Sequence, residues 1–250
     1  MRSYKALFFS LIFSVLSVSM LKSENQPTID HITSNNGLSH NTIRCMLQDT
    51  TGFLWFGSLN GLNRYDGHKI KTLNPVNTSI NSLSSGKIKE LYQDSRGYIW
   101  VRTYSDIIHC YNPYLESFLP LFSSREERQA RHNLFYEDKE KNVWLGGAGS
   151  GCVRISFSGE KIETKQFSAK TAQTGIASDT VNDIFEDSKL NVWILTSNGI
   201  SLYENGKIKL MECRAGVSQN FLKAYEAGGK IYFIADNGYV IAYFCTGSIG

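Results

Sequence analysis

Short runs in which apolar and polar residues alternate follow one another along most of the chain. The clearest series has the period of two that is expected of half-buried strands. Its four runs lie at residues 42–48, 53–58, 62–65 and 68–73. Asp-Thr-Thr-Gly, Leu-Asn-Gly and Asp-Gly sequences separate the runs, and such residues favour tight turns. This series predicts one sheet of four short antiparallel strands.

The same series recurs along the chain, marked by tryptophans that are 45, 44 and 49 residues apart. An aspartate precedes each tryptophan by six residues, which gives the pairs Asp49 and Trp55, Asp94 and Trp100, Asp138 and Trp144, and Asp187 and Trp193. A weaker fifth copy has Tyr232 in place of tryptophan, with Gly229 three and Glu226 six residues before it. A period of 40 to 50 residues with four strands per unit is typical of a β-propeller.

The repeat therefore predicts an all-β fold of about five four-stranded blades. We expect the blades near residues 38–80, 83–122, 130–168, 177–212 and 218–250. The repeated aspartates are interpreted as turn caps and the tryptophans as core residues, because one active site or sugar platform has no use for a copy in every blade.

The turn before each tryptophan needs a residue that tolerates a positive φ. Gly52 and Gly97 fill that position in the first two units, whereas the next two carry Lys141 and Leu190 there. Asparagine follows one residue later in both, at positions 142 and 191. Since asparagine is the next best residue for a left-handed conformation, we expect that conformation to move to it.

Composition changes this picture little. Hydrophobic residues make up 42% and charged residues 20% of the 250 positions, as in an ordinary globular protein. The net charge of +3 comes from Arg2, Lys5 and Lys22, without which basic and acidic residues balance at 23 each. A neutral chain gives no case for contact with nucleic acid.

The N-terminus has the layout of an export signal. A short basic start precedes an apolar run over residues 6–21, and polar residues follow. We expect residues 1–23 to be a signal peptide and residues 24–250 to lie in the periplasm. An uncleaved anchor and a buried first helix are the alternatives.

These residues closely resemble the two-component regulator propeller repeat. Leu38-Ser39, Ile43, the segment from Asp49 to Gly57, Gly61-Leu62 and Tyr65-Asp66 follow its pattern in full, and the later units follow it in part. The resemblance covers about residues 29–245. It implies the periplasmic sensor of a hybrid two-component histidine kinase, in which two seven-bladed propellers bind oligosaccharides and act, as a homodimer, on a kinase that controls glycan-use genes.

This chain departs from that pattern by ending at Gly250 with about five units and no kinase module. We expect a truncated sensor whose kinase activity lies in modules that are absent here. Residues 29–33 are predicted to form an outer strand without a blade of its own. We expect an open arc or a strained five-bladed ring, with apolar faces exposed on the first and fifth blades.

The search for reactive groups favours a binding module. No residue is predicted to be catalytic, and no cofactor or metal site is expected, because the five histidines and five cysteines lack ligand spacing. The cysteines are interpreted as mostly buried thiols, with one disulfide left open. The glycine-rich segment at residues 146–151 is interpreted as a blade turn, because it lacks the Lys-Ser/Thr of a phosphate loop and is followed by a strand.

The segment after Trp100 breaks the repeat and supplies the predicted ligand-binding residues. Arg102 replaces a glycine, and Tyr104 and Asp106 follow; together these side chains can stack on and hydrogen-bond a sugar or an acidic glycan. Ordinary drift of an edge blade would explain the same change. Inter-blade segments 74–87 and 123–131 are expected on the same face. A glycan hydrolase or lyase, or a scaffold for dimerisation alone, are the alternative functions.

Overall fold

The computed structural model describes residues 29–75, 82–122, 124–159, 161–171, 175–212 and 218–244. Residues 1–32 and 33–250 are separate units, and all strands belong to the second. The predicted signal peptide lies outside the described residues. No helix among the described residues is long and apolar enough to cross a membrane.

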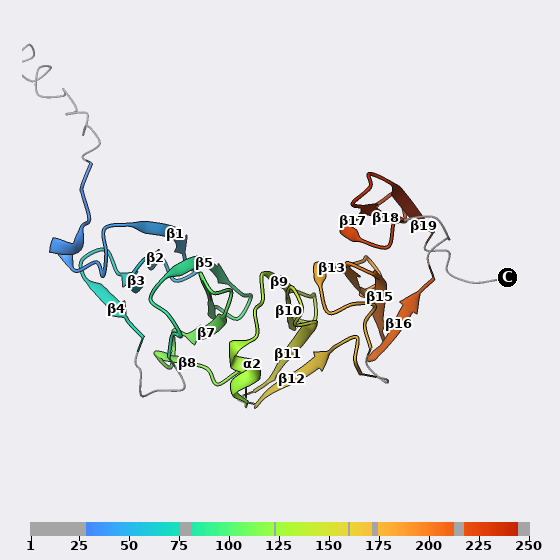
Figure 1. The fold of residues 1–250 in the computed structure, drawn as a ribbon. Helices are drawn as coiled ribbons and strands as arrows, with labels where there is room; N and C mark the ends of the chain where they lie inside the picture. The colour runs from blue at the N-terminus through green and yellow to red at the C-terminus, as the bar shows by residue number, and fades with distance from the viewer. Residues whose placement is uncertain are drawn as a thin grey trace, which may run out of the picture. The chain divides into compact units, whose positions relative to one another are not determined.

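The second unit consists of five antiparallel sheets, each built from consecutive strands and called blades 1 to 5 (Figure 1). Blade 1 contains β1 (Ile43–Gln48), β2 (Leu54–Ser58), β3 (Gly61–Tyr65) and β4 (Ile70–Leu73). Blade 2 contains β5 (Ile88–Gln93), β6 (Ile99–Thr103), β7 (Ile108–Asn112) and β8 (Ser117–Phe118). Blade 3 contains β9 (Leu134–Glu137), β10 (Val143–Gly146), β11 (Cys152–Ser158) and β12 (Lys161–Phe167).

Blade 4 contains β13 (Val181–Glu186), β14 (Val192–Thr196), β15 (Gly199–Glu204) and β16 (Lys207–Met211). Blade 5 has three strands among the described residues: β17 (Phe221–Ala227), β18 (Lys230–Ala235) and β19 (Val240–Phe244). A 3₁₀ turn (Ser34–Asn36) precedes blade 1, and the short helix α2 (Arg125–Gln129) joins blades 2 and 3. The predicted all-β propeller fold is confirmed, with boundaries that differ from the expected runs by one or two residues at most strand ends.

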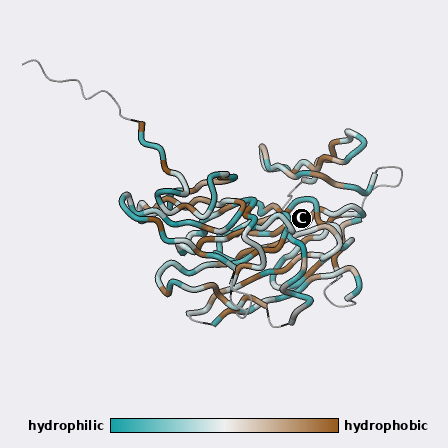
Figure 2. Tube along the Cα trace, turned by 60° about the vertical axis from the view of Figure 1, so that its left-hand side comes forward, coloured by the Kyte–Doolittle hydropathy of each residue, from teal (hydrophilic) through white to brown (hydrophobic). Residues whose placement is uncertain are grey.

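Each tryptophan lies in the second strand of its blade and packs against the next blade. Trp55 is fully buried among Ile99, Val101 and Tyr111 of blade 2, and its ring meets that of Tyr111 edge to face at 5.5 Å. Trp100, Trp144 and Trp193 occupy the same place at the next three interfaces. The apolar core is therefore a series of inter-blade layers, and Figure 2 shows hydrophobic and hydrophilic stretches alternating along the strands.

The repeated aspartate and tryptophan form one hydrogen-bonded unit. Asp49 Oδ1 accepts the backbone N–H groups of Thr51 and Phe53, as predicted for a turn cap. Its Oδ2 accepts the Trp55 indole N–H at 2.7 Å. The corresponding aspartate–indole distances are 3.0 Å at Trp100, 2.8 Å at Trp144 and 2.9 Å at Trp193. One carboxylate thus accepts hydrogen bonds from the backbone of the turn and from a buried indole N–H. A buried donor costs free energy if it is left unpaired.

The prediction for the turns of blades 3 and 4 is wrong. Lys141 (φ 67°) and Leu190 (φ 69°) themselves adopt the left-handed conformation that Gly52 and Gly97 adopt in blades 1 and 2. The asparagine that follows donates its side-chain amide to the capping aspartate, at 3.0 Å from Asn142 to Asp138 and from Asn191 to Asp187. The geometry of the turn requires the positive φ at the same position in all four blades. The hydrogen bond from the asparagine side chain offsets the strain of that conformation.

A second repeated contact joins neighbouring blades. In blades 2 to 5, a residue at or next to the end of the first strand accepts a hydrogen bond from the backbone N–H just after the capping aspartate of the preceding blade. The distances are 2.9 Å from Thr50 to Gln93, 2.9 Å from Ser95 to Glu137, 3.0 Å from Lys139 to Glu186 and 2.7 Å from Ser188 to Glu226. Glu226 therefore belongs to this set and does not take the place of a turn aspartate, because the Gly228–Gly229 turn of blade 5 is shorter.

Residues 29–33 do not form the predicted outer strand. Ile29 is 84% exposed, and the Thr33 side chain instead accepts the Asn35 N–H to cap the 3₁₀ turn. A strand needs a partner for its backbone hydrogen bonds, and none of the described strands pairs with this segment.

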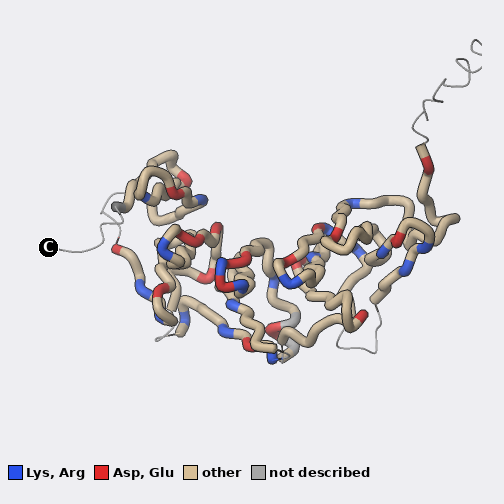
Figure 3. Tube along the Cα trace, turned by 180° about the vertical axis from the view of Figure 1, so that it is seen from behind, with Lys and Arg blue, Asp and Glu red and all other residues tan. Residues whose placement is uncertain are grey.

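Blades 1 and 5 carry exposed apolar residues, but so do blades 2 and 4, in which Tyr114, Leu115 and Leu210 are exposed. In blade 5, Tyr225 and Val240 are 67% and 58% exposed, on the face opposite the one that packs on Trp193. Tyr232 shares that face and is only partly buried. Met46 of blade 1 is 72% exposed. Charged residues of both signs are interspersed along the chain of the blades (Figure 3).

Candidate functional site

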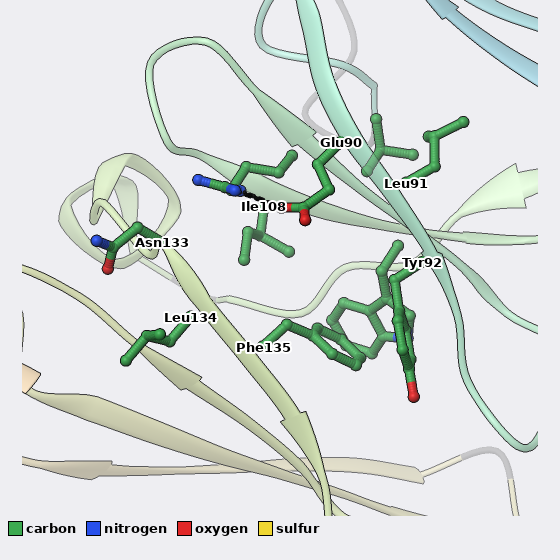
Figure 4. A pocket seen from close by; sticks show the side chains of 10 residues that line it. Glu90, Leu91, Tyr92, Ile108, Asn133, Leu134 and Phe135 are labelled. Carbon is green, nitrogen blue, oxygen red and sulfur yellow. Dashed lines mark hydrogen bonds and ion pairs between the residues drawn. The ribbon is translucent and has the colours of Figure 1, made fainter. Parts of the chain in front are cut away.

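A pocket of about 250 Å³ lies between blades 2 and 3 (Figure 4). Strands β5, β6 and β9 supply most of its wall. It is lined by Glu90, Leu91, Tyr92, Trp100, Val101, Arg102, Ile108, Asn133, Leu134 and Phe135. One part of this lining is aromatic and another is charged.

Tyr92 and Phe135 form the aromatic wall. Their ring centroids are 4.1 Å apart, and Phe135 also meets Trp100 at 5.2 Å (Figure 4). Tyr92 keeps 40% of its surface exposed, so the pair offers both an apolar surface and a phenol. Burial and the nearby Glu137 and Asp94 carboxylates raise the pKa of Tyr92, which keeps its hydroxyl a neutral donor. Such a surface suits the apolar face of a sugar ring.

Arg102 supplies the charged part of the lining. Its Nε donates to Glu90 Oε2 at 2.9 Å, and its Nη1 donates to Asp106 Oδ1 at 3.1 Å. Lys89 donates to the same Asp106 oxygen at 2.9 Å. Burial acts to raise the pKa of Asp106, but the hydrogen bonds and charges of Lys89 and Arg102 outweigh it and lower that pKa. The carboxylates of Glu90 and Asp106 thus hold the Arg102 guanidinium in place beside the pocket.

The structure brings two of the three predicted ligand residues together. Arg102 lines the pocket, and Asp106 forms an ion pair with Arg102. Tyr104 lies outside the pocket, with the Arg44 guanidinium 5.6 Å from its ring centroid. Sequence reasoning missed Glu90, Tyr92, Asn133 and Phe135. They lie in or next to the first strands of blades 2 and 3, where the sequence does not depart from the repeat pattern. Only the packing of blade 2 against blade 3 shows that they converge.

The loops beside Arg102 meet as the sequence predicted. The His132 N–H, from the segment between blades 2 and 3, donates to the Asp106 carbonyl at 2.7 Å. The Gly61 and Gly199 N–H groups make equivalent bonds to Gly86 and Gln219, both at 2.7 Å. Turns between second and third strands thus share one face with the inter-blade loops.

The glycine-rich segment is a blade turn, as interpreted. It joins β10 to β11, and the N–H groups of Gly149 and Gly151 donate to the Asp179 carbonyl at 3.0 and 2.8 Å. Those donors therefore do not point at a phosphate site. Among the described residues, no group of three or more His, Cys, Asp and Glu side chains is placed to hold a metal ion.

The described cysteines are free thiols. Cys110 and Cys152 are fully buried, and burial raises the pKa of both. Burial likewise raises the pKa of Cys45 to about 11, so none of the three is a reactive thiolate at neutral pH. Cys213 and Cys245 lie outside the described residues.

Comparisons with known proteins agree with the repeat. Residues 37–60 and 82–105 match the family described as two component regulator propeller. Histidine kinase P4 of Formosa agariphila is 34% identical to this chain over 64 residues, which are 26% of this chain and 5% of that protein. The chain therefore spans a small part of the curated relative that it matches.

Two solved structures are similar in fold. An extracellular domain attributed to the hybrid two component system BT3049 of B. thetaiotaomicron is 19% identical, with a TM-score of 0.46, over 86% of this chain and 35% of that one. Virginiamycin B lyase from Staphylococcus aureus is 16% identical, with a TM-score of 0.43, over 80% of this chain and 68% of that one. The residues that match the two component regulator propeller family, 37–60 and 82–105, include the first two strands of blades 1 and 2.

Proposed function

We propose that this chain is an extracytoplasmic ligand-sensing propeller of a two-component signalling system, and that it binds an oligosaccharide without catalysing a reaction. The regulator propeller repeats and the histidine kinase relative support the signalling role. The sensor acts, in this proposal, as a periplasmic homodimer whose kinase part controls glycan-use genes.

The pocket between blades 2 and 3 carries the proposal for ligand binding. Its Tyr92–Phe135 surface packs against a sugar ring, while Arg102 and Glu90 hydrogen-bond ring hydroxyls. A volume of about 250 Å³ accommodates one sugar unit of a longer chain. The two blades that form the walls hold these groups rigidly, as a binding site on loops and strand ends requires.

Calorimetry of the purified chain against a panel of neutral and acidic oligosaccharides tests the proposal. We expect one or more oligosaccharides to bind, and Arg102→Gln and Tyr92→Ala to weaken binding at least about tenfold, since each removes a direct contact. Tyr104→Ala is the matched control, because Tyr104 lies outside the pocket and should leave the affinity unchanged.

Two results would contradict this proposal. If no oligosaccharide binds, the chain is not the sensing part, and a scaffold role is favoured. If a polysaccharide is cleaved and single carboxylate substitutions abolish the cleavage, the chain is an enzyme.

A further inference from the structure

A second pocket, of about 380 Å³, lies between blades 3 and 4 on the side of the capping-aspartate turns. Arg154 of β11 lines it, together with Tyr203, Asn205 and Gly206 of blade 4. The pocket has a mostly polar lining and shares no residue with the pocket at Arg102. Ligand binding at this pocket does not depend on the proposed function.

At the corresponding place between blades 1 and 2, a carboxylate of the chain itself binds the basic side chains. Arg64 lies opposite Trp55 and Lys71 in neighbouring strands. Both cations bind Glu116 of blade 2, at 2.9 Å from Arg64 and 2.6 Å from Lys71. A carboxylate from the turn of the next blade therefore neutralises this basic pair.

Blade 3 repeats the basic pair without that carboxylate. Arg154 lies opposite Trp144 and Lys165, in the register of Arg64. Gly206 of blade 4 precedes β16 directly, as Glu116 precedes β8, and both residues have a positive φ. Lys165 therefore donates to the Gly206 carbonyl at 3.3 Å, and its ammonium also lies 5.3 Å from the centroid of the Phe167 ring.

The Arg154 guanidinium lies over the Trp144 and Tyr203 rings, 6.0 and 5.6 Å from their centroids, but among the described residues no carboxylate accepts its hydrogen bond as Glu116 accepts that of Arg64. Its Nε is buried without a hydrogen-bond partner, and its side chain is only 21% exposed. The Glu140 carboxylate is 3.7 Å away and lies on the exposed rim. Two other carboxylates of the lining are already engaged: Asp138 accepts the Trp144 indole, and Glu186 accepts the Lys139 N–H. A buried guanidinium donor without an acceptor costs free energy that an incoming anion would recover.

We infer that this pocket binds the carboxylate of an acidic sugar, which occupies between Arg154 and Lys165 the place that Glu116 occupies between Arg64 and Lys71. The Asn205 side chain lines the pocket and suits the hydroxyls of the sugar, while the Tyr203 ring lies against the Arg154 and Lys165 cations. The volume is within the range of small-molecule sites.

Calorimetry of the purified chain with D-glucuronate at low ionic strength tests the inference, with D-glucose as the probe that lacks the carboxylate. We expect glucuronate alone to bind, and Arg154→Gln to weaken it at least about tenfold because a charged bidentate contact is lost. Arg64→Gln is the matched control and should leave the affinity unchanged. Glu140→Gln should tighten binding, because it removes the competing rim carboxylate.

A second pair of variants keeps the test decisive if Arg154→Gln does not fold. A side chain at position 206 meets no atom within 4 Å at its Cβ. Gly206→Glu should supply the missing carboxylate and abolish glucuronate binding, whereas Gly206→Gln has the same backbone strain without the charge and should retain it.

Three results would overturn the inference: no binding of glucuronate, equal loss with Arg64→Gln and Arg154→Gln, or inorganic sulfate binding as tightly as glucuronate. Failure of this site leaves the pocket at Arg102 untouched, since no lining residue is common to the two.

Discussion

At the scale of single residues, the capping aspartates do more than close turns. Asp49 is 5% exposed and accepts bonds from the Thr51 hydroxyl, two backbone N–H groups and the Trp55 indole. Burial acts to raise the pKa of Asp49, but these hydrogen bonds outweigh it and lower that pKa below its ordinary value. The ionised carboxylate is therefore favoured in the folded chain more than in the unfolded chain.

This difference predicts a pH-dependent contribution to stability. Because the folded-state pKa of Asp49 is depressed, its contribution is complete above the unfolded pKa of about 3.9 and is lost as the pH falls through the lower folded value. Asp49→Asn should lower the free energy of unfolding at pH 7 by about 1–3 kcal/mol, the cost of losing a charged hydrogen-bond acceptor. Urea unfolding between pH 7 and pH 2 measures both effects, and the gap between the two proteins should narrow at the acid end. A constant gap would contradict the role of the charge.

Leu190 offers a prediction of opposite sign. A φ of 69° costs free energy for a residue that has a Cβ. The Leu190 side chain is largely exposed. Leu190→Gly should therefore raise the free energy of unfolding by up to about 1 kcal/mol, since relief of the left-handed strain exceeds the entropy that glycine adds to the unfolded state. Thermal unfolding checks this, with Lys189→Gly as a neighbouring control that should lower stability.

At the scale of elements, each blade is joined to the next by the Trp layer and by the acceptor near the end of the next blade's first strand. Glu137 in β9 accepts the Ser95 N–H at 2.9 Å and the Ser95 hydroxyl at 2.7 Å. Gln48 holds the same position in blade 1, but its side-chain amide donates to the Gly52 carbonyl of its own blade. The repeat therefore contains a built-in comparison between a bridging and a non-bridging residue.

Removing the bridge should loosen one interface. Glu137→Ala should lower the free energy of unfolding by about 1–3 kcal/mol, because it leaves the Ser95 donors without their charged acceptor. It should also speed hydrogen exchange of the Ser95 amide. Gln48→Ala should change stability by less than about 0.5 kcal/mol, as expected of a surface substitution. Equal effects of the two substitutions would show that the inter-blade bond contributes nothing.

At the scale of the whole molecule, stability in a repeat protein is a sum over units and neighbour interfaces. Blades 2, 3 and 4 each pack on two neighbours, whereas the exposed Met46, Tyr225 and Val240 lie in blades 1 and 5. Exposed apolar residues that cluster on one face favour self-association.

Hydrogen exchange of residues 24–250 should therefore follow the order of the blades. Amides of β17–β19 and β1 should exchange fastest and those of β10 and β14 slowest, since the latter lie in blades covered on both faces. Size-exclusion chromatography should show association, which Tyr225→Lys together with Val240→Lys should reduce. Uniform protection in a monodisperse monomer would mean that the two terminal faces cover one another.

The sequence by itself determined the repeat, the four-stranded blades, the turn caps and the buried tryptophans. These features rest on local spacing, in which period-two alternation and turn chemistry act within about ten residues. Only the tertiary structure decided which side chains meet: the indole bond of Asp49 within blade 1, the bridge from Glu137 to Ser95 between blades, and the pockets at Arg102 and Arg154. Such contacts join residues from different strands or different blades, and they depend on the register of one sheet against the next. The positive φ of Lys141 was decided in the same way, because a turn held at both ends by paired strands leaves its residue no other conformation.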